Sequence, residues 1–205
     1  MHLLHPLTII IALAAAIPSP SPPSISKSPA FRINANPPPS HPLSTIQNWN
    51  FSSYHISACS SRAVFSPNST GRTFYANGTD AEFSSRTATL NTDGGTPPWP
   101  WGVSVAGPDE VDEEGRRSVS IACGRGTEGV QVAEWPGTVY YETGSWYVCN
   151  ATLVYGPAMA LFWRTKVERT PEGCVNVELQ AWCVDGGGGV EHAFGRESTC
   201  YRAAL

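Results

Sequence analysis

The sequence of 205 residues has few charges and no large excess of either sign. Charged residues make up 15% of the chain and the formal net charge is −4, so the positive excess that binds nucleic acid or anionic lipid is missing. It also lacks an apolar run of the roughly 20 residues that a helix needs to cross a bilayer. We therefore expect neither a nucleic-acid partner nor a membrane partner.

The motifs of common catalytic and metal sites are also absent. There is no G-x-S-x-G turn for a serine nucleophile, and no C-x-x-C or H-x-x-x-H pair for a metal. Gly124–Gly129 comes close to a nucleotide-binding fingerprint, but the strand-like segment Val130–Trp135 follows it, so we interpret it as a hairpin turn. The acidic run Asp109–Glu114 lacks the ligand pattern of a calcium loop and is interpreted as a solvated loop. We predict no catalytic, cofactor-binding or metal-binding residues.

An enzyme is the alternative to a binding protein. His55 and His192 are the histidines of the region expected to fold. Either could meet Glu142 or Glu178 in a ribonuclease-like acid–base pair, because such groups come together only on folding. Both glutamates lie among polar positions, where solvated side chains are the ordinary explanation. The alternative function is a secreted hydrolase of glycan or RNA, or a carbohydrate-binding protein.

The N-terminal region is typical of a secreted protein. An uncharged, mainly apolar stretch ends in Ala14 and Ala16, which have the spacing of a cleavage site, so we predict a signal peptide over 1–16 and an extracellular protein. The segment 17–42 is rich in Pro and Ser and cannot bury enough apolar surface to fold, which predicts a disordered arm. The folded domain is expected over 43–205.

From residue 43 onward apolar and polar residues alternate with the period of two that half-buried strands require. Val175–Cys183 shows this most clearly. Gly and Pro interrupt the pattern at short intervals, and no stretch of twelve residues has a helical period. We predict an all-β fold, a compact antiparallel barrel or sandwich. The segment 80–117 fits the pattern poorly and is interpreted as a loop insertion with one hairpin on the rim of the sheet.

The tryptophans fall into two groups. Trp146, Trp163 and Trp182 lie in predicted strands, where large side chains fill the interior of a small barrel. Trp182 fits least well, because it shares a strand face with polar residues. Trp99 and Trp101 lie in a proline-rich segment interpreted as a surface loop. Two interpretations stay open for this pair: the rings bind a partner, or they fold over the mouth of the barrel as a plug.

Two covalent modifications are expected in a secreted chain. An even number of cysteines indicates disulfides, and spacing alone leaves many pairings open. The cysteines are Cys59, Cys123, Cys149, Cys174, Cys183 and Cys200. Four N-x-S/T sequons predict a glycoprotein. They lie at Asn50, Asn68, Asn77 and Asn150.

The C-terminal half resembles a known family. Its strands and cysteines follow one another as the strand ending in Cys123, Ser145–Cys149, Leu161–Val167, Val175–Cys183, a glycine-rich loop at 186–189, and Cys200. This order and spacing resemble the secreted fungal family typified by the major Alternaria allergen. The resemblance covers about 118–205, with a weaker match from Ile46.

The resemblance implies a compact antiparallel β-barrel that is secreted by a fungus and able to form a homodimer. It implies no established enzyme activity, but an allergen, elicitor or effector acting on plants, whose partner is a host defence protein or a small ligand. It also implies two disulfides, and the two cysteines that remain, the first and the fourth, are then expected to pair. The implied bridges are Cys123–Cys149, Cys183–Cys200 and Cys59–Cys174.

Overall fold

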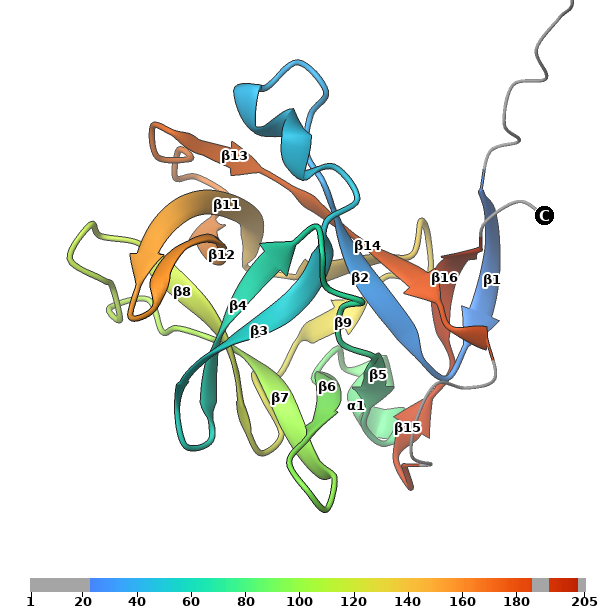
Figure 1. Cartoon of the computed structure of the whole chain (residues 1–205). Helices are drawn as coiled ribbons and strands as arrows, with labels where there is room; N and C mark the ends of the chain where they lie inside the picture. Colours follow the sequence, from blue (N-terminus) through green and yellow to red (C-terminus); the bar gives the residue numbers. More distant parts are fainter. Residues whose placement is uncertain (1–22, 186–191, 203–205) are drawn as a thin grey trace, which may run out of the picture.

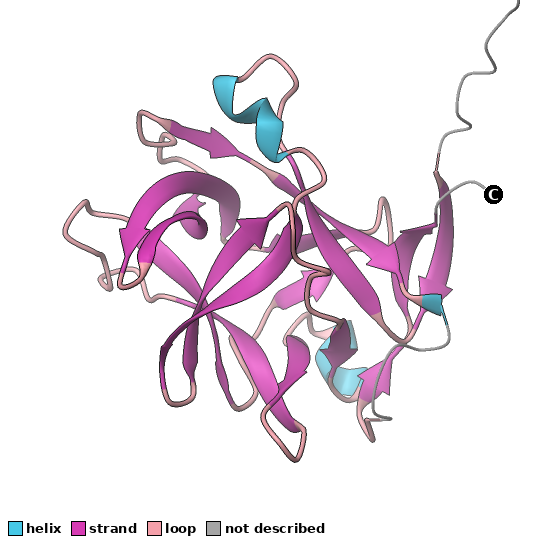
Figure 2. Cartoon of the chain, in the orientation of Figure 1, coloured by secondary structure: helices cyan, strands magenta, loops and turns pink. Residues whose placement is uncertain are grey.

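The computed structural model describes residues 23–185 and 192–202. The predicted signal peptide over 1–16 and the glycine-rich loop at 186–189 lie outside these residues. Strands make up 53% of the protein and helices 6%, and Figure 2 shows how little of the chain is helical. The predicted all-β class is confirmed.

Eight strands form a closed barrel (Figure 1). In the order of their pairing they are β2 (Phe31–Asn36), β3 (Asn50–Ser57), β4 (Ser60–Ser66), β12 (Gly156–Thr165), β8 (Arg117–Cys123), β7 (Trp99–Val105), β6 (Thr89–Gly94) and β5 (Phe74–Asn77). Every pairing around this ring is antiparallel, and the ring closes where Phe31 of β2 pairs with Phe74 of β5. β4 also pairs directly with β8.

The remaining strands extend the sheet beyond the ring. They are β1 (Ser24–Ser28), β9 (Val130–Val132), β10 (Thr138–Tyr141), β11 (Gly144–Leu153), β13 (Cys174–Asn176), β14 (Glu178–Cys183), β15 (Gly195–Arg196) and β16 (Ser198–Arg202). β14 pairs with β2 over its whole length and carries β10 and β16 on its other side. Two short helices, η1 (Pro42–Ile46) and α1 (Asp80–Ser84), connect strands.

The barrel interior is filled by the apolar faces that the sequence predicts. Trp146 and Trp163, from neighbouring strands, are 6% and 3% exposed and belong to this core. The odd-numbered positions from Val175 to Ala181 are buried, and the even-numbered ones are exposed or half-exposed. The single strand predicted here is divided into β13, which pairs with β11, and β14, which pairs with β2. Val177 lies between them, and its backbone N–H donates to the carbonyl oxygen of Trp146 in β11.

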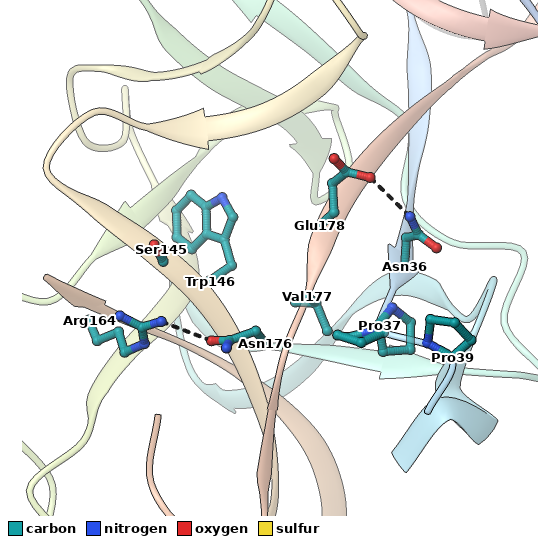
Figure 3. Close-up of a pocket in the computed structure, with 10 residues that line it drawn as sticks. Asn36, Pro37, Pro39, Ser145, Trp146, Arg164, Asn176, Val177 and Glu178 are labelled. Carbon is teal, nitrogen blue, oxygen red and sulfur yellow. Dashed lines mark hydrogen bonds between the residues drawn. The ribbon is translucent and has the colours of Figure 1, made fainter. Parts of the chain in front are cut away.

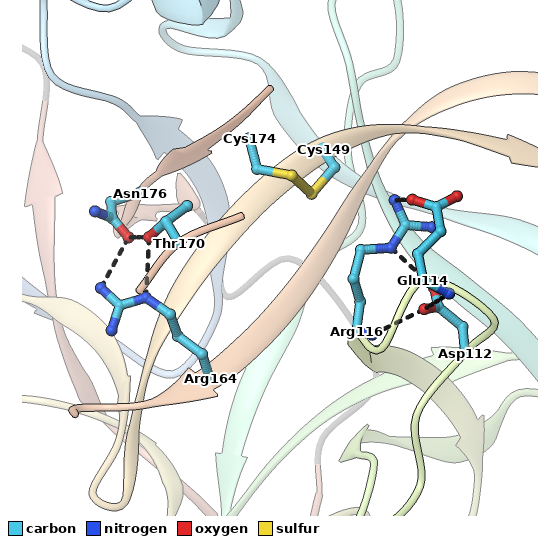
Figure 4. The surroundings of a disulfide bond; sticks show 8 residues. All are labelled: Asp112, Glu114, Arg116, Cys149, Arg164, Thr170, Cys174 and Asn176. Atoms are coloured by element: carbon cyan, nitrogen blue, oxygen red, sulfur yellow. Dashed lines mark hydrogen bonds and ion pairs between the residues drawn. A yellow bond between two sulfur atoms is a disulfide. The ribbon is translucent and has the colours of Figure 1, made fainter. Parts of the chain in front are cut away.

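A second apolar cluster lies on the other face of the β11–β12 hairpin, which curls so that both of its faces are covered. Phe162 of this cluster is covered by the guanidinium of Arg116, 4.5 Å from the ring centroid. Arg116 is 8% exposed and is held by the carboxylates of Asp112 and Glu114 at 2.9 and 2.7 Å (Figure 4). The acidic run is therefore only in part the solvated loop predicted from the sequence, since two of its carboxylates hold this arginine.

The predicted disordered arm over 17–42 is wrong from residue 24 onward. β1 and β2 lie within it, and Phe31, Ile33 and Ala35 are fully buried in the barrel core. The alternation of F-R-I-N-A-N is the normal strand signal, but the prolines on both sides of it dominate the composition. The barrel domain accordingly begins before residue 43.

The interpretation of 80–117 as a rim insertion is also wrong. β6 and β7 from this segment are members of the barrel ring. The segment Gly124–Gly129 is not a hairpin turn, because β8 and β9, which it joins, do not pair with each other. It packs against β7 so closely that a Cβ on Gly102 would lie 2.1 Å from the Gly126 nitrogen. A glycine is therefore required at position 102.

All six cysteines form disulfides, and two of the three implied pairings are wrong. The bridges are Cys59–Cys123, Cys149–Cys174 and Cys183–Cys200. Only the last agrees with the pattern that the resemblance implied. The implied bridge between the second and third cysteines cannot form, because β12 lies between β8 and β11, and a disulfide needs Cα atoms within about 7 Å.

Candidate functional site

The hairpin of β6 and β7 carries the two tryptophans that were expected to bind a partner. It projects at the lower edge of the molecule in Figure 1, and Trp99 pairs with Gly94 across a turn over 95–98. Both tryptophans lie in β7 and not in a loop, which corrects the sequence interpretation. Trp101 packs against the barrel core, whereas Trp99, two positions nearer the tip, is 64% exposed. One ring is therefore packed on the core and the other is mostly exposed.

Several contacts hold the base of this hairpin in place. Trp101 is paired with Cys123 of β8, whose disulfide partner Cys59 lies in the β3–β4 turn. The backbone N–H of Gly124 donates to the carbonyl oxygen of Pro100 at 3.2 Å. The Trp101 ring lies so close to Gly94 that a Cβ there would come within 2.9 Å of the indole nitrogen. The hairpin that carries Trp99 is therefore held firmly at its base.

A histidine and a carboxylate meet near the same hairpin. His192 Nε2 lies 3.1 Å from Oδ2 of Asp93, and its ring stacks on Tyr75 with 3.7 Å between centroids. Burial, with a further contribution from the Asp93 charge, raises the pKa of Tyr75. The contact ties the segment around His192 to β6.

The acid–base pairs predicted for the enzyme alternative are not formed. Glu142 pairs with Arg86 at 2.9 Å on the surface, and Glu178 accepts a hydrogen bond from Asn36, also at 2.9 Å. His55 is exposed on β3. The carboxylate that His192 contacts is that of Asp93, and not that of Glu142 or Glu178. Asp93 had no signal in the sequence because it lies in a segment interpreted as an insertion.

A groove of about 550 Å³ opens between the β11–β12 hairpin and β14 (Figure 3). Several of its polar side chains already have hydrogen-bond partners in the protein. Arg164 donates to Asn176 at 3.1 Å and to Thr170 at 2.9 Å (Figure 4), and Trp146 Nε1 donates to the Val139 carbonyl oxygen. The opposite wall includes Pro37 and neighbouring prolines. This groove therefore offers a ligand few unmet hydrogen bonds.

A second, smaller pocket of about 390 Å³ lies on the outer face of β2 and β14. Its polar lining includes Arg32, Asn34 and Trp182. Oδ1 of Asn34 and Nε1 of Trp182 are buried without a hydrogen-bond partner in the described part of the chain. The sequence indicates that Trp182 lies on a polar strand face, but it does not show which residues surround the ring.

Comparisons with known proteins place the chain in a family. A model of a domain of unknown function, DUF7907, matches residues 28–183. The chain belongs to this family. It is also 28% identical over 204 residues to antigenic protein SchS34 of Stachybotrys chartarum, an alignment that covers 89% of this chain and 90% of the relative. No solved structure matches.

The DUF7907 match has two consequences for this chain. It begins within β1 and ends at the last residue of β14, so it includes the strand that closes the barrel and agrees with a domain that starts before residue 43. The relative is a fungal antigenic protein, which indicates a fungal, allergen-like family and is compatible with a protein that is not an enzyme.

The four sequons of this DUF7907 domain differ in how exposed their asparagines are. Asn68 and Asn150 are exposed, and Asn77 is partly buried. Asn50 Nδ2 donates to the carbonyl oxygen of Ser69 at 2.8 Å, so its amide is engaged in the folded protein. Glycosylation stays a prediction at all four sequons. Asn68 and Asn150 offer the most room for a glycan, because they are exposed.

The described residues provide neither a metal-binding cluster nor a membrane-spanning helix. No group of three or more His, Cys, Asp or Glu side chains among them could hold a metal ion. No helix among them is long and apolar enough to cross a membrane. The three disulfides are typical of a protein of an oxidising compartment such as the extracellular space.

Proposed function

We propose that this protein is a secreted fungal protein of the allergen or elicitor type that acts by binding a host protein, with Trp99 as the central contact. The observation that carries the proposal is the contrast within one strand. Trp101 packs against the core. Trp99 lies on the same face of β7, at the tip of the hairpin, and is 64% exposed. The described residues leave most of this large apolar ring uncovered.

The chemistry of the hairpin tip suits a binding contact. Interface energy concentrates in a few residues, and tryptophan is enriched among them. Pro98 and Pro100 flank Trp99 and fix two backbone torsions, and the hydrogen bond to Pro100 and the Cys59–Cys123 bridge hold the base. A contact that is already ordered loses less conformational entropy on binding. A rigid, exposed indole is therefore a strong anchor for a partner.

The proposal includes the predicted signal peptide over 1–16, secretion, and glycosylation of the exposed sequons. It also includes kinship with the family typified by the major Alternaria allergen, and a homodimer. Support comes from the barrel fold, the three disulfides and the fungal antigenic relative. The proposed partner is a defence protein in the extracellular fluid of a plant host.

The test compares two exposed tryptophans. Trp99→Ala should weaken binding to a partner purified from plant extracellular fluid by about 30-fold or more, which corresponds to a hot spot of about 2 kcal/mol. Trp135→Ala is the matched control, because Trp135 is 75% exposed and lies in the separate connection between β9 and β10. Surface plasmon resonance measures both, after circular dichroism has confirmed that each variant is folded. Equal affinities for wild type and Trp99→Ala would overturn the proposal.

A further inference from the structure

Trp182 is a large aromatic side chain on the outer face of the sheet. It lies in β14 directly opposite Arg32 of β2 and shares its face with Glu178 and Gln180. The indole is only partly buried and packs against Tyr201 of β16, with 5.6 Å between ring centroids. An outward tryptophan in a polar row contributes little to the barrel core, and it forms one wall of the 390 Å³ pocket.

Two side chains that line the pocket each carry a buried polar atom whose hydrogen bond is unmet in the described part of the chain. These atoms are the indole N–H of Trp182, which can only donate, and Oδ1 of Asn34, which can only accept. A buried polar atom without a partner costs free energy, and native proteins have few of them. Both side chains are only half-buried, and a ligand in the pocket would reach these atoms if the side chains turn about their torsions on binding.

These two atoms select the chemistry of a ligand. A carboxylate could accept from the indole but leaves the amide oxygen without a donor, and an ammonium has the opposite defect. A hydroxyl group both donates and accepts, so neighbouring hydroxyls meet both requirements. Arg32 and Asp185 bring one charge of each sign to the lining, which favours a ligand without net charge.

We infer that this pocket binds a neutral sugar ring. The hydroxyls of a pyranose pair with Asn34 and with the indole N–H, and its apolar C–H face lies on the Trp182 ring. The volume falls within the roughly 300–1,000 Å³ of small-molecule sites. This site is on β2 and β14 and does not depend on the proposed contact of Trp99.

The aromatic wall of the pocket is fixed by a disulfide. Trp182 and Tyr201 are register partners in β14 and β16. Each is next in sequence to a cysteine of the Cys183–Cys200 bridge. The bridge therefore holds the two strands where the rings of Trp182 and Tyr201 meet, and so holds the Trp182 side of the pocket in place.

The experiment follows the indole N–H signal of Trp182 by proton–nitrogen NMR. Because Asn50 borders the pocket and carries a sequon, the protein is produced in a host that adds no N-glycans. The probes are glucose, galactose, mannose, xylose and N-acetylglucosamine, with gluconate as a carboxylate control. The Trp182 signal is assigned by its loss in Trp182→Phe, which keeps an aromatic ring, and the exposed Trp135 is the internal reference.

At least one neutral sugar should shift the Trp182 signal in a saturable way and leave the Trp135 signal in place. Asn34→Leu should weaken that sugar by about fivefold to tenfold, the effect of one net hydrogen bond, while the thermal midpoint shows that the variant is folded. The inference is overturned if no neutral sugar gives a saturable shift, as when ordered water meets the two atoms. It is also overturned if only gluconate binds, or if Asn34→Leu binds as tightly as wild type.

Discussion

Phe31→Ala should destabilise the protein severely, because Phe31 lies where the barrel closes. Its side chain is fully buried, and its register partner across the closing pair is Phe74, which is fully buried too. Removing a buried phenylalanine ring costs about 3–5 kcal/mol, most where neighbours cannot collapse into the space. A closed ring of strands resists such collapse, so we expect a loss near the upper end of this range.

Urea unfolding followed by tryptophan fluorescence measures the loss, and a thermal melt should show a midpoint lower by about 6–20 °C for a chain of this length. Arg32→Ala is the matched control, because Arg32 is the next residue of the same strand and is exposed on the outer face. Its effect should stay within about 0.5 kcal/mol. A loss below about 1 kcal/mol for Phe31→Ala would refute the place of β2 in the barrel and restore a disordered arm over this segment.

Two other predictions concern stability. Replacing Cys149 and Cys174 with Ser opens a loop of 25 residues and should lower the free energy of unfolding by about 3.5 kcal/mol in the chain-entropy model, as measured by denaturant unfolding; an unchanged midpoint would contradict this pairing. Hydrogen bonds from the Arg117 side chain and the Thr165 backbone N–H lower the pKa of Glu168 from 4.5 to about 2. The ionised form therefore adds stability above pH 4.5 that is lost as the pH falls towards 2. Glu168→Gln should be less stable than wild type at neutral pH, and unfolding curves across this range should show the difference shrinking; a constant difference would contradict the assignment.

Local alternation explains how much of the fold could be predicted. Val175–Cys183 and the strands around Trp146 and Trp163 carry a period of two over many residues, and their faces are oriented as the sequence indicates. β2 shows the same period over only six residues between prolines, so composition misled the interpretation there. β6 and β7 were missed because their glycines and prolines, typical of loops, lie at a hairpin tip of the barrel.

The disulfides and the site depend on which strands are neighbours, and this cannot be deduced from spacing. Cys149 pairs with Cys174 because β11 and β13 lie side by side in register. The different fates of Trp99 and Trp101 depend on where the barrel ends, two residues apart on one strand face. The contact of His192 with Asp93 needed β6 as a strand, which the sequence interpretation lacked.

Photocrosslinking from position 99 tests the central claim most directly. A photoreactive phenylalanine analogue replaces Trp99 in one protein and Trp135 in another, and each is irradiated in plant extracellular fluid. One protein should be crosslinked from position 99. Unlabelled wild type should displace it and unlabelled Trp99→Ala should not, and position 135 should give no such product. A product that forms equally from both positions, or that unlabelled Trp99→Ala displaces as well as wild type does, would contradict the claim that the protein binds its partner through the β6–β7 hairpin.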